Sequence, residues 1–593
     1  MNTKLIKFFN AAIIEASKLD PIELNIKAAK VGYIVHPDCC NESVNKFIED
    51  QAININSTFY KTWQQVTNML REELYIDQLI HYASTYGTEY EGETYTKNPN
   101  PINIEYNTYK VILPISRDEL WKKCYNIVCS GIALNEHTCS AICDYIWEWK
   151  EVCGKDFNID NVKNREAVTI FCDKFNIFPK DPISLLRYIV YKSTNQTTLI
   201  KDDTLIGLIK IWGESFDWSM LTDEQLKSLS TIFYRFKRIF LAYKSKNNHN
   251  NNVINKIRRY AKKYHKPMVK GILEDITSNV YTPQQIEEAA KSASNFKIIQ
   301  ILQSIAERTH IWVYGGKDMY IIRNGKVYIK EKNHDSSMAH HLNIVFTKFW
   351  AQLINNLRDK ACVVKFPKNL ELSCPVSEKK FIGNIPYGSC YKMDNHNFIG
   401  IYWKNEWGTK DFDLSLISED GVKYGWNSEY FNANHSVIYS GDMTNADPEA
   451  SEILYCDKKC PNGVIKVNRY NGVNGSKYKL FFGTEKINNI GKNYMVDPNN
   501  IKFEEMMTSE NTEQAIGYVF NNNIYFMDYK LGSSRVSDKN EFADIIGRKS
   551  QSTFKLKNVL IEAGFQEYNP EIHEKIDLDL TDLNKDTLIN IFS

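Results

Sequence analysis

Five acidic residues in the last third of the chain have the types and spacing that can hold a metal ion: Asp411, Asp413, Asp442, Glu449 and Glu452. The first two lie two residues apart in an alternating run that predicts a strand, so their carboxylates leave the same face. The third follows a glycine at a predicted turn. Calcium takes about six to eight hard oxygen ligands from carboxylates, carbonyls and water. If strand pairing brings the turns together, these residues form a calcium site.

The same spacing has a simpler interpretation, which spacing by itself fits better. Asp411 and Asp413 are also what an edge strand carries when one of its faces points to solvent. A second acidic pair, Asp577 and Asp579, is expected to be such a solvated edge. The burial of Asp411 and Asp413 decides between a solvated face and a cation site.

Strand and turn signals surround these acidic residues. Apolar residues alternate over 399–403 and again over 412–416, and a third short strand is expected over 437–440. The tripeptide Glu419-Asp420-Gly421 is typical of a turn between two strands. The pattern therefore predicts consecutive β-strands that carry the acidic residues on and beside them.

The residues DFDLSLISEDG, GWN and SGDMTNADPEASE together resemble the TerD family, the calcium-binding β-sandwich proteins of tellurite-resistance and stress systems. The resemblance places Asp411 and Asp413 at the family's first acidic motif and Asp442 at its later Gly-Asp turn. The sequence departs from the pattern at Ser415, where a further Asp is usual. The acidic loop after the turn is thinned to Asp447, Glu449 and Glu452. The resemblance implies a β-sandwich domain that binds Ca²⁺.

A wider resemblance covers most of the chain. Residues 375–388 (PVSEKKFIGNIPYG), 82–88 (YASTYGT) and 184–191 (SLLRYIVY) are similar to segments of uncharacterised bacterial proteins. Those proteins join a long helical N-terminal region to a TerD-like domain, sometimes with a RING-like zinc finger, of which this sequence shows no pattern. The resemblance implies a helical N-terminal region fused to a β-rich C-terminal domain.

A second chemical pattern is a basic segment over 235–270, which contains no Asp or Glu. Four tyrosines are interleaved with its cations. Phosphates attract such clusters through counterion release, and exposed tyrosines stack on bases. The segment therefore predicts an RNA- or DNA-binding surface through Lys237, Arg238, Lys256, Arg258, Arg259, Lys262, Lys263 and Lys266.

Two observations bear on that prediction in opposite directions. A charge run is more often a solvated helix face, and the tyrosines Tyr234, Tyr243, Tyr260 and Tyr264 can equally be core residues. An array of helices with a basic stripe resembles, weakly, the TROVE module of Ro ribonucleoproteins, and this resemblance implies RNA binding. No motif is firm enough to transfer individual residues from that module.

The element patterns predict an α+β protein of several domains, since single cores stop growing near roughly 250–300 residues. Residues 1–310 predict a helical array, in one piece or in two subdomains divided near 100–115 or 155–180. Residues 311–395 predict a hairpin and an amphipathic helix, and residues 396–593 a β-sandwich with a C-terminal helix. Within the array, 222–244 is expected to be one helix and 247–252 a polar loop.

Composition indicates the cellular compartment more than the function. The formal net charge is +1, so global charge indicates no partner. Thirteen scattered cysteines favour free thiols in a reducing compartment. No apolar run is long enough to span a membrane, and the first residues predict an amphipathic helix. We therefore expect a cytoplasmic protein without a membrane span.

No catalytic constellation is recognisable, because the sequence has no GxGxxG, GxxxxGK[ST], HExxH or GxSxG motif. We therefore expect a non-enzymatic binding or scaffold protein of a stress-response type system, with calcium bound by a TerD-like domain. RNA binding through 235–270 is the first alternative. An enzyme without a recognisable motif is the second.

Overall fold

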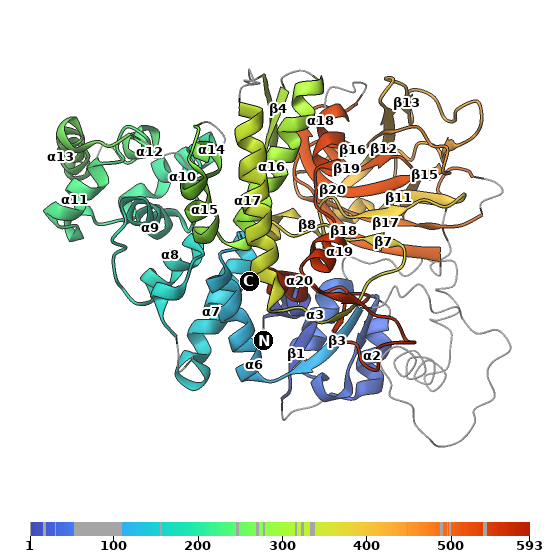
Figure 1. Cartoon of the computed structure of the whole chain (residues 1–593), viewed down its shortest axis with the longest axis horizontal. Coiled ribbons are helices and arrows are strands. Elements are labelled where there is room, and N and C mark those ends of the chain that lie inside the picture. The colour runs from blue at the N-terminus through green and yellow to red at the C-terminus, as the bar shows by residue number, and fades with distance from the viewer. Residues whose placement is uncertain are drawn as a thin grey trace. The chain divides into compact units, whose positions relative to one another are not determined.

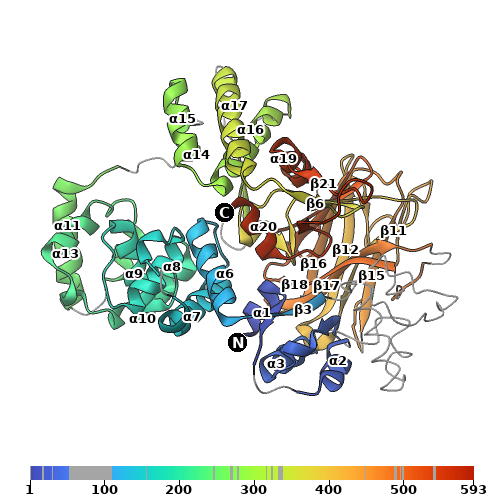
Figure 2. The same cartoon turned by 60° about the horizontal axis from the view of Figure 1, so that its bottom comes forward.

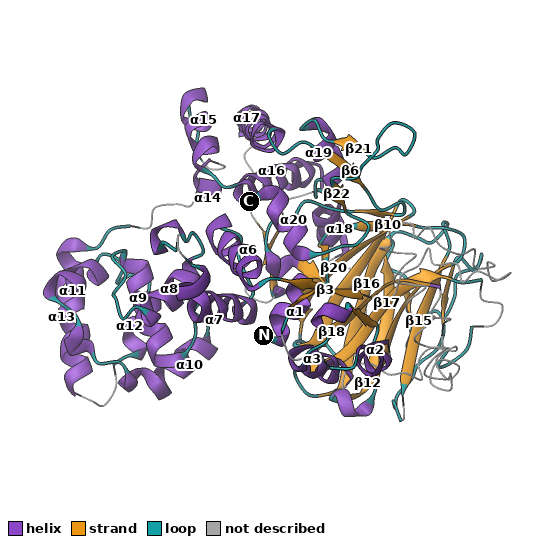
Figure 3. Ribbon diagram, turned by 90° about the horizontal axis from the view of Figure 1, so that it is seen from below, coloured by secondary structure: helices purple, strands orange, loops and turns teal. Residues whose placement is uncertain are grey.

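The computed structural model describes residues 2–15, 19–29, 31–52, 110–154, 157–244, 248–267, 272–276, 279–314, 317–321, 325–331, 338–447, 449–486, 490–494, 496, 500–537 and 543–593. The segment 82–88 used for the wider resemblance lies outside the described residues. The α+β architecture predicted from the sequence is confirmed, with a β-rich C-terminal half (Figure 3).

The chain forms two compact units with interleaved boundaries. The first unit contains Met1–Arg117, Asn295–Ala339 and Phe349–Phe592. The second contains Asp118–Ser294, His340–Lys348 and the last residue. The sequence prediction grouped 1–310 together, whereas the structure places 1–117 with the β-rich half. The boundary falls just beyond 100–115, one of the two predicted divisions.

Two antiparallel sheets make up most of the first unit (Figure 1). The larger has the order β13 (Lys423–Tyr424), β12 (Thr409–Ser418), β16 (Gly463–Gly472), β19 (Glu513–Phe520), β20 (Asn523–Gly532), β10 (Cys390–Lys392) and β7 (Leu370–Glu371). The smaller has the order β14 (Val437–Tyr439), β15 (Ala450–Cys456), β11 (Asn397–Trp403), β17 (Ser476–Thr484) and β18 (Ile501–Ser509). The strands predicted at 399–403, 412–416 and 437–440 are β11, β12 and β14.

Aromatic side chains from the two sheets pack against each other. The ring centroid of Phe412 on β12 lies 5.8 Å from Trp403 on β11 and 5.0 Å from Tyr478 on β17. Phe526 on β20 lies 5.8 Å from Phe482 on β17. Rings at these separations make edge-to-face contacts that add to the burial of apolar area. The two sheets therefore form a sandwich, as predicted.

The first unit also contains a small parallel sheet near the N-terminus, which the sequence prediction placed in a helical region. Its strand order is β1 (Ala11–Ile13), β3 (Lys110–Ile115), β2 (Tyr33–Val35), and it is accompanied by α1 (Thr3–Phe9), α2 (Pro21–Ala29) and α3 (Glu42–Ala52). The carboxylate of Glu505 on β18 joins this sheet to the sandwich, 3.1 Å from the amine of Lys7 and 3.0 Å from that of Lys110.

The remaining elements of the first unit include the predicted hairpin, β4 (Lys317–Ile321) with β5 (Val327–Glu331). Its helices are α16 (Asn295–Tyr314), α18 (Ala543–Gln551), α19 (Leu556–Glu562) and α20 (Lys585–Phe592). The short strands β6 (Val363–Lys365), β21 (Gln566–Glu567) and β22 (Leu578–Asp579) form a further sheet. The predicted amphipathic helix is α17 (Ala339–Arg358), whose residues are divided between the two units.

The second unit is built of helices throughout its described residues (Figure 2). They are α6 (Arg117–Ser130), α7 (Glu136–Cys153), α8 (Arg165–Lys174), α9 (Pro182–Thr194), α10 (Asp203–Trp212), α11 (Asp223–Ser230), α12 (Lys237–Ala242), α13 (Asn248–Tyr264), α14 (Ile272–Ile276) and α15 (Pro283–Ser292). Asp181 caps α9, since its carboxylate accepts from the Ser184 N–H at 2.8 Å.

Two local predictions in the second unit are wrong. The helix expected over 222–244 breaks at 231–236, where the Ser230 and Thr231 hydroxyls donate to carbonyls of the preceding turn. The polar loop expected over 247–252 is instead the start of α13, at least from Asn248. Asn250, Ile254 and Ile257 are all buried at helical spacing, so the asparagine continues an inward-facing stripe that composition alone conceals.

All thirteen cysteines are free thiols, as predicted. Among the described helices, none has the length and apolar character that crossing a membrane requires.

Candidate metal centre

Strand β12 and the loop after β14 bring together three of the five predicted acidic ligands. Asp411 and Asp413 leave the same face of β12, and Asp442 follows Gly441, whose φ of +116° allows the tight turn after β14. One carboxylate oxygen from each of the three lies within 4.8 Å of the others. In the described parts of the chain this is the one group of three or more acidic, His or Cys side chains so arranged.

Two of the three carboxylates are buried, that of Asp442 is partly buried, and all three are incompletely hydrogen-bonded. Asp411 is 8% exposed and Asp413 is 4% exposed, because β12 is an interior strand between β13 and β16. The interpretation that Asp411 and Asp413 lie on a solvent-facing edge strand, which their spacing favoured, is therefore wrong. Buried Oδ1 of Asp411, Oδ2 of Asp413 and Oδ1 of Asp442 make no hydrogen bond to the described protein. Unpaired buried oxygens are costly, and a bound cation satisfies them.

The clustering of negative charge changes the acid–base chemistry of the pair on β12. Burial is the main cause that raises the pKa of Asp413 to about 8; Asp411 and Asp442 add to the effect and Lys423 opposes it. Burial and then Asp442 raise the pKa of Asp411 to about 6. Near neutral pH the cluster therefore retains a proton when no cation is bound, and a cation must displace it.

Glu452 on β15 positions the cluster rather than joining it. Its Oε2 accepts from the Leu414 N–H at 2.8 Å, and its Oε1 accepts from the Met443 N–H at 2.9 Å. Leu414 follows Asp413 and Met443 follows Asp442 in the sequence. One fully buried carboxylate thus fixes the backbone beside two of the three candidate ligands and connects the two sheets. The sequence named Glu452 as a candidate ligand, and in the structure both of its carboxylate oxygens accept hydrogen bonds from backbone N–H groups.

Glu449, the fifth predicted ligand, is directed elsewhere, since its Oε2 accepts from the Tyr402 hydroxyl at 3.0 Å. Ser415 lies on the same strand face as Asp413 and is fully buried, with a hydroxyl that finds no partner in the described chain. Tyr439 on β14 was missed by sequence reasoning. Burial, and then the charges of Glu452, Asp413 and Asp442, raise its pKa, which places its hydroxyl close to the cluster.

The basic residues predicted to bind nucleic acid lie in the second unit and divide into two groups. Two are neutralised by residues distant in sequence: Lys256 pairs with Asp223 at 2.8 Å, and Arg238 pairs with Asp203. The other six are exposed and make no ion pair with a described residue: Lys237, Arg258, Arg259, Lys262, Lys263 and Lys266. Four of these six lie on the outer face of α13.

The interleaved tyrosines also divide. Tyr243 is a core residue, 1% exposed, and its hydroxyl donates to Ser193 at 3.1 Å. The Tyr260 hydroxyl donates to Asp223 at 2.7 Å. Tyr234 and Tyr264 are 46% and 38% exposed, so two of the four rings are accessible for stacking.

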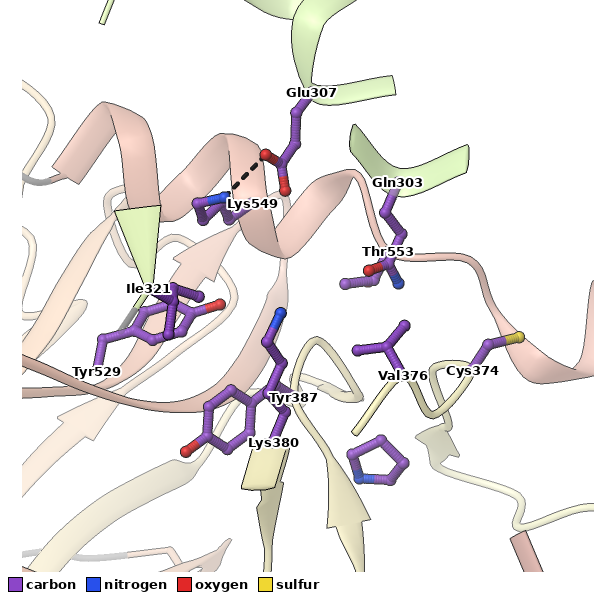
Figure 4. Close-up of a pocket in the computed structure, with 11 residues that line it drawn as sticks. Gln303, Glu307, Ile321, Cys374, Val376, Lys380, Tyr387, Tyr529, Lys549 and Thr553 are labelled. Carbon is purple, nitrogen blue, oxygen red and sulfur yellow. Dashed lines mark hydrogen bonds and ion pairs between the residues drawn. The ribbon is translucent and has the colours of Figure 1, made fainter. Parts of the chain in front are cut away.

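A separate small cavity in the first unit is lined by Lys380, Tyr387, Tyr529, Lys549, Glu307 and neighbouring residues (Figure 4). The Lys549 amine is 2.8 Å from the Glu307 carboxylate, and the Lys380 amine points into the space between the lining side chains. Burial, followed by repulsion from Lys549, lowers the pKa of Lys380 to about 8. The cavity measures about 20 Å³, which is room for about one water molecule and too little for an organic ligand.

Comparisons with protein-family models, with curated proteins and with solved structures find no match to this chain. Support for a function therefore comes from the geometry of the described residues. The acidic cluster is the feature with the most direct chemical meaning, because its atoms converge and its hydrogen bonds are incomplete.

Proposed function

We propose that the β-rich unit binds a divalent cation, calcium, through Asp411, Asp413 and Asp442. One observation carries this proposal: three carboxylates converge within 4.8 Å, and each has a buried oxygen without a hydrogen-bond partner in the described protein. A site of this kind is unfavourable when empty, since like charges repel at short range in a medium of low polarity. A doubly charged ion removes both costs together.

Calcium fits the donor set better than magnesium. Calcium accepts several carboxylates in flexible geometry, whereas magnesium usually keeps its waters and takes only one or two. Backbone carbonyls and water would complete the coordination shell. Glu452, already bonded to two backbone N–H groups, would hold the ligands in place without contacting the ion.

For the whole chain we propose a non-enzymatic binding or scaffold protein of a stress-response type system, acting in the cytoplasm. The resemblance of residues 411–452 to the TerD family supports this role, and the buried acidic cluster gives it a chemical basis. In such a protein the cation would fix the end of the sandwich where β12 and the loop after β14 meet.

Calorimetric titration of the full chain with Ca²⁺ tests the proposal, with Mg²⁺ as the competing ion. We expect binding of Ca²⁺ at one site, and its loss in Asp413→Asn. Asp447→Asn is the matched control, because Asp447 is an exposed acid in the same loop. Absence of heat with the wild-type chain, or equal binding by Asp413→Asn, would remove the metal from the proposal.

RNA binding is a second candidate, favoured by the exposed face of α13. Arg258, Arg259, Lys262 and Lys263 lie on that face, while Ile254 and Ile257 face the core. Binding of single-stranded RNA should weaken as salt rises, because phosphate contacts release counterions. Arg258→Ala with Arg259→Ala should weaken it further. Lys210→Ala, an exposed cation on α10, serves as the control, and an equal effect of this control would exclude α13 as the site.

A further inference from the structure

A larger cavity lies within the helical unit, and no residue of α13 lines it. It measures about 400 Å³ and opens between the start of α8, the middle of α9, residues 198–201, and the turn before α12. Helices α8 and α9 contact each other and lie side by side in Figures 1 and 2. Cavities of roughly 300–1,000 Å³ are typical of sites for small molecules. None of the residues predicted from the sequence to bind a ligand lines it.

Four cations and one carboxylate line this cavity: Arg165, Arg187, Lys201, Arg235 and Glu166. Arg187 is partly buried, and one of its guanidinium nitrogens donates to the Thr197 carbonyl. Its buried Nε has no hydrogen-bond partner in the described chain. Burial lowers the pKa of Arg187, the nearby carboxylate of Glu166 opposes this shift, and Arg165 adds to it. The cavity therefore carries positive charge and an unused donor.

Phe236 holds two of these cations in place. The guanidinium carbon of Arg235 lies 5.0 Å from the centre of its ring, and the amine of Lys201 lies 5.1 Å from the same point. Cations within about 6 Å of a ring centre are attracted to its face. Phe236 is buried, and the two cations lie over the face of its ring. Two long side chains, which would otherwise move freely, are thereby fixed at the cavity.

The backbone around Lys201 is fixed as well. Arg238 donates from its guanidinium to the Lys201 carbonyl at 3.0 Å and pairs with Asp203. At the start of α8, the N–H groups of Glu166 and Ala167 already donate to Asn164. Recognition in this cavity therefore depends on the side chains rather than on a free helix terminus.

We propose that this cavity binds a phosphorylated small molecule, whose phosphate group contacts the four lining cations, Arg165, Arg187, Lys201 and Arg235. Guanidinium groups match phosphate oxygens in pairs of parallel hydrogen bonds, and several cations together compensate more than one negative charge. Ile183 and Leu199 line the apolar part, where the organic body of the ligand lies. The Glu166 carboxylate is an acceptor for a hydroxyl or amine of that body.

The test is a titration of the full chain with AMP, ATP, ribose 5-phosphate and inorganic phosphate, in the presence of a chelator. The chelator keeps the acidic cluster of the other unit from contributing through metal-bound nucleotide. We expect at least one organic phosphate to bind more tightly than inorganic phosphate. Arg165→Ala combined with Lys201→Ala should weaken that binding roughly tenfold or more, as expected for lost hydrogen bonds to charged groups. Both residues are exposed at the cavity mouth, so this variant should fold.

Lys262→Ala combined with Lys263→Ala is the matched control, since it removes two exposed cations of the same unit that do not line the cavity. Binding that is unchanged in the control and weakened in the cavity variant supports the proposal. Equal binding of inorganic and organic phosphates would overturn the assignment of an organic body. Absence of binding by every phosphate, or an equal loss in both variants, would overturn the site itself.

Discussion

Both units bring charges of one sign close together, but the charged groups differ in whether they can change their protonation state. The sandwich brings together Asp411, Asp413 and Asp442, and the helical unit brings together Arg165, Arg187, Lys201 and Arg235. A carboxylate can accept a proton when no cation is near, so the pKa values of Asp411 and Asp413 rise to about 6 and about 8. An arginine stays charged at every physiological pH. The acidic cluster can therefore take up a proton in place of a cation, whereas the cations of the basic cavity contact the ring face of Phe236 and the carbonyl of Thr197.

The small cavity at Lys380 is an intermediate case. Its amine is a cation that can lose its proton, and burial with the neighbouring Lys549 lowers its pKa to about 8. The three sites differ in whether their charged groups can gain or lose a proton near neutral pH. Burial is therefore not the only property that decides how each site accommodates its charges.

The largest effect is expected at the residue that holds the acidic cluster together. Glu452→Ala leaves the N–H groups of Leu414 and Met443 without their acceptors in a buried place. Two unsatisfied donors should lower the free energy of unfolding of the sandwich by about 4 kcal/mol, and calcium binding should be lost as well. Glu449→Ala is the control. Chemical denaturation measures both, and an equal effect of the two variants would show that Glu452 has no special role.

The second effect is a dependence of stability on pH when calcium is absent. Because the pKa values of Asp411 and Asp413 are raised in the folded state, folding favours their protonated forms. Stability is then highest below about pH 4 to 5 for these two groups and is lost as pH rises toward 8. Their contribution to the free energy of unfolding should fall across that range, with the larger share from Asp413, whose pKa is raised further.

Calorimetry of the wild-type chain with and without Ca²⁺ at several pH values measures this dependence. Calcium should reduce the slope, and its binding should release about one proton near pH 7. Asp413→Asn should reduce the slope without calcium. A transition of the sandwich whose pH dependence is identical in wild type and Asp413→Asn would contradict the account.

The third effect concerns Lys380→Met. A lysine with a lowered pKa destabilises the fold while charged in both states, and stability is regained as pH rises from about 8 toward 10.5. The substitution should therefore stabilise the first unit by roughly 1 to 2 kcal/mol at pH 7 and by less at pH 10. Lys549→Met, which breaks the pair with Glu307, should destabilise it. Thermal unfolding of both variants at pH 7 and pH 10 measures these effects. Equal stability of Lys380→Met and the wild type at pH 7 would contradict the prediction.

The smallest effect is expected in the helical unit. Because the cations of its cavity do not titrate, its melting temperature should respond to anions rather than to pH between about 5 and 8. Phosphate in place of chloride at equal ionic strength should stabilise this unit by about 0.5 to 1 kcal/mol, if the anion concentration is near its dissociation constant. Arg235→Gln should reduce the gain. An equal response to both anions would argue against the cavity as their site.

The spacing of apolar residues predicted secondary structure correctly where an element buries one face against a single core. The alternation over 399–403 and 412–416 predicted β11 and β12, and the amphipathic helix expected within 311–395 is α17, because the residues that a strand or helix buries on one face recur at its own spacing along the chain. The same reasoning failed at 231–236, where two hydroxyls bond to the preceding turn, and at Asn250, a polar residue on a buried stripe. Side-chain hydrogen bonds and tertiary burial outweigh propensity at both places.

The sequence by itself determined the chemistry of the acidic set: hard oxygen ligands, two of them on one face of one strand. Only the tertiary structure decided that Asp442 joins them, that Glu449 does not, and that Glu452 binds backbone instead of cation. It also created the basic cavity from residues of α8, α9 and the turn before α12, of which only Arg235 belongs to the basic segment that the sequence singled out. The physical reason is that spacing along a strand or helix fixes directions within one element, whereas the distance between elements depends on which strands pair and which helices pack.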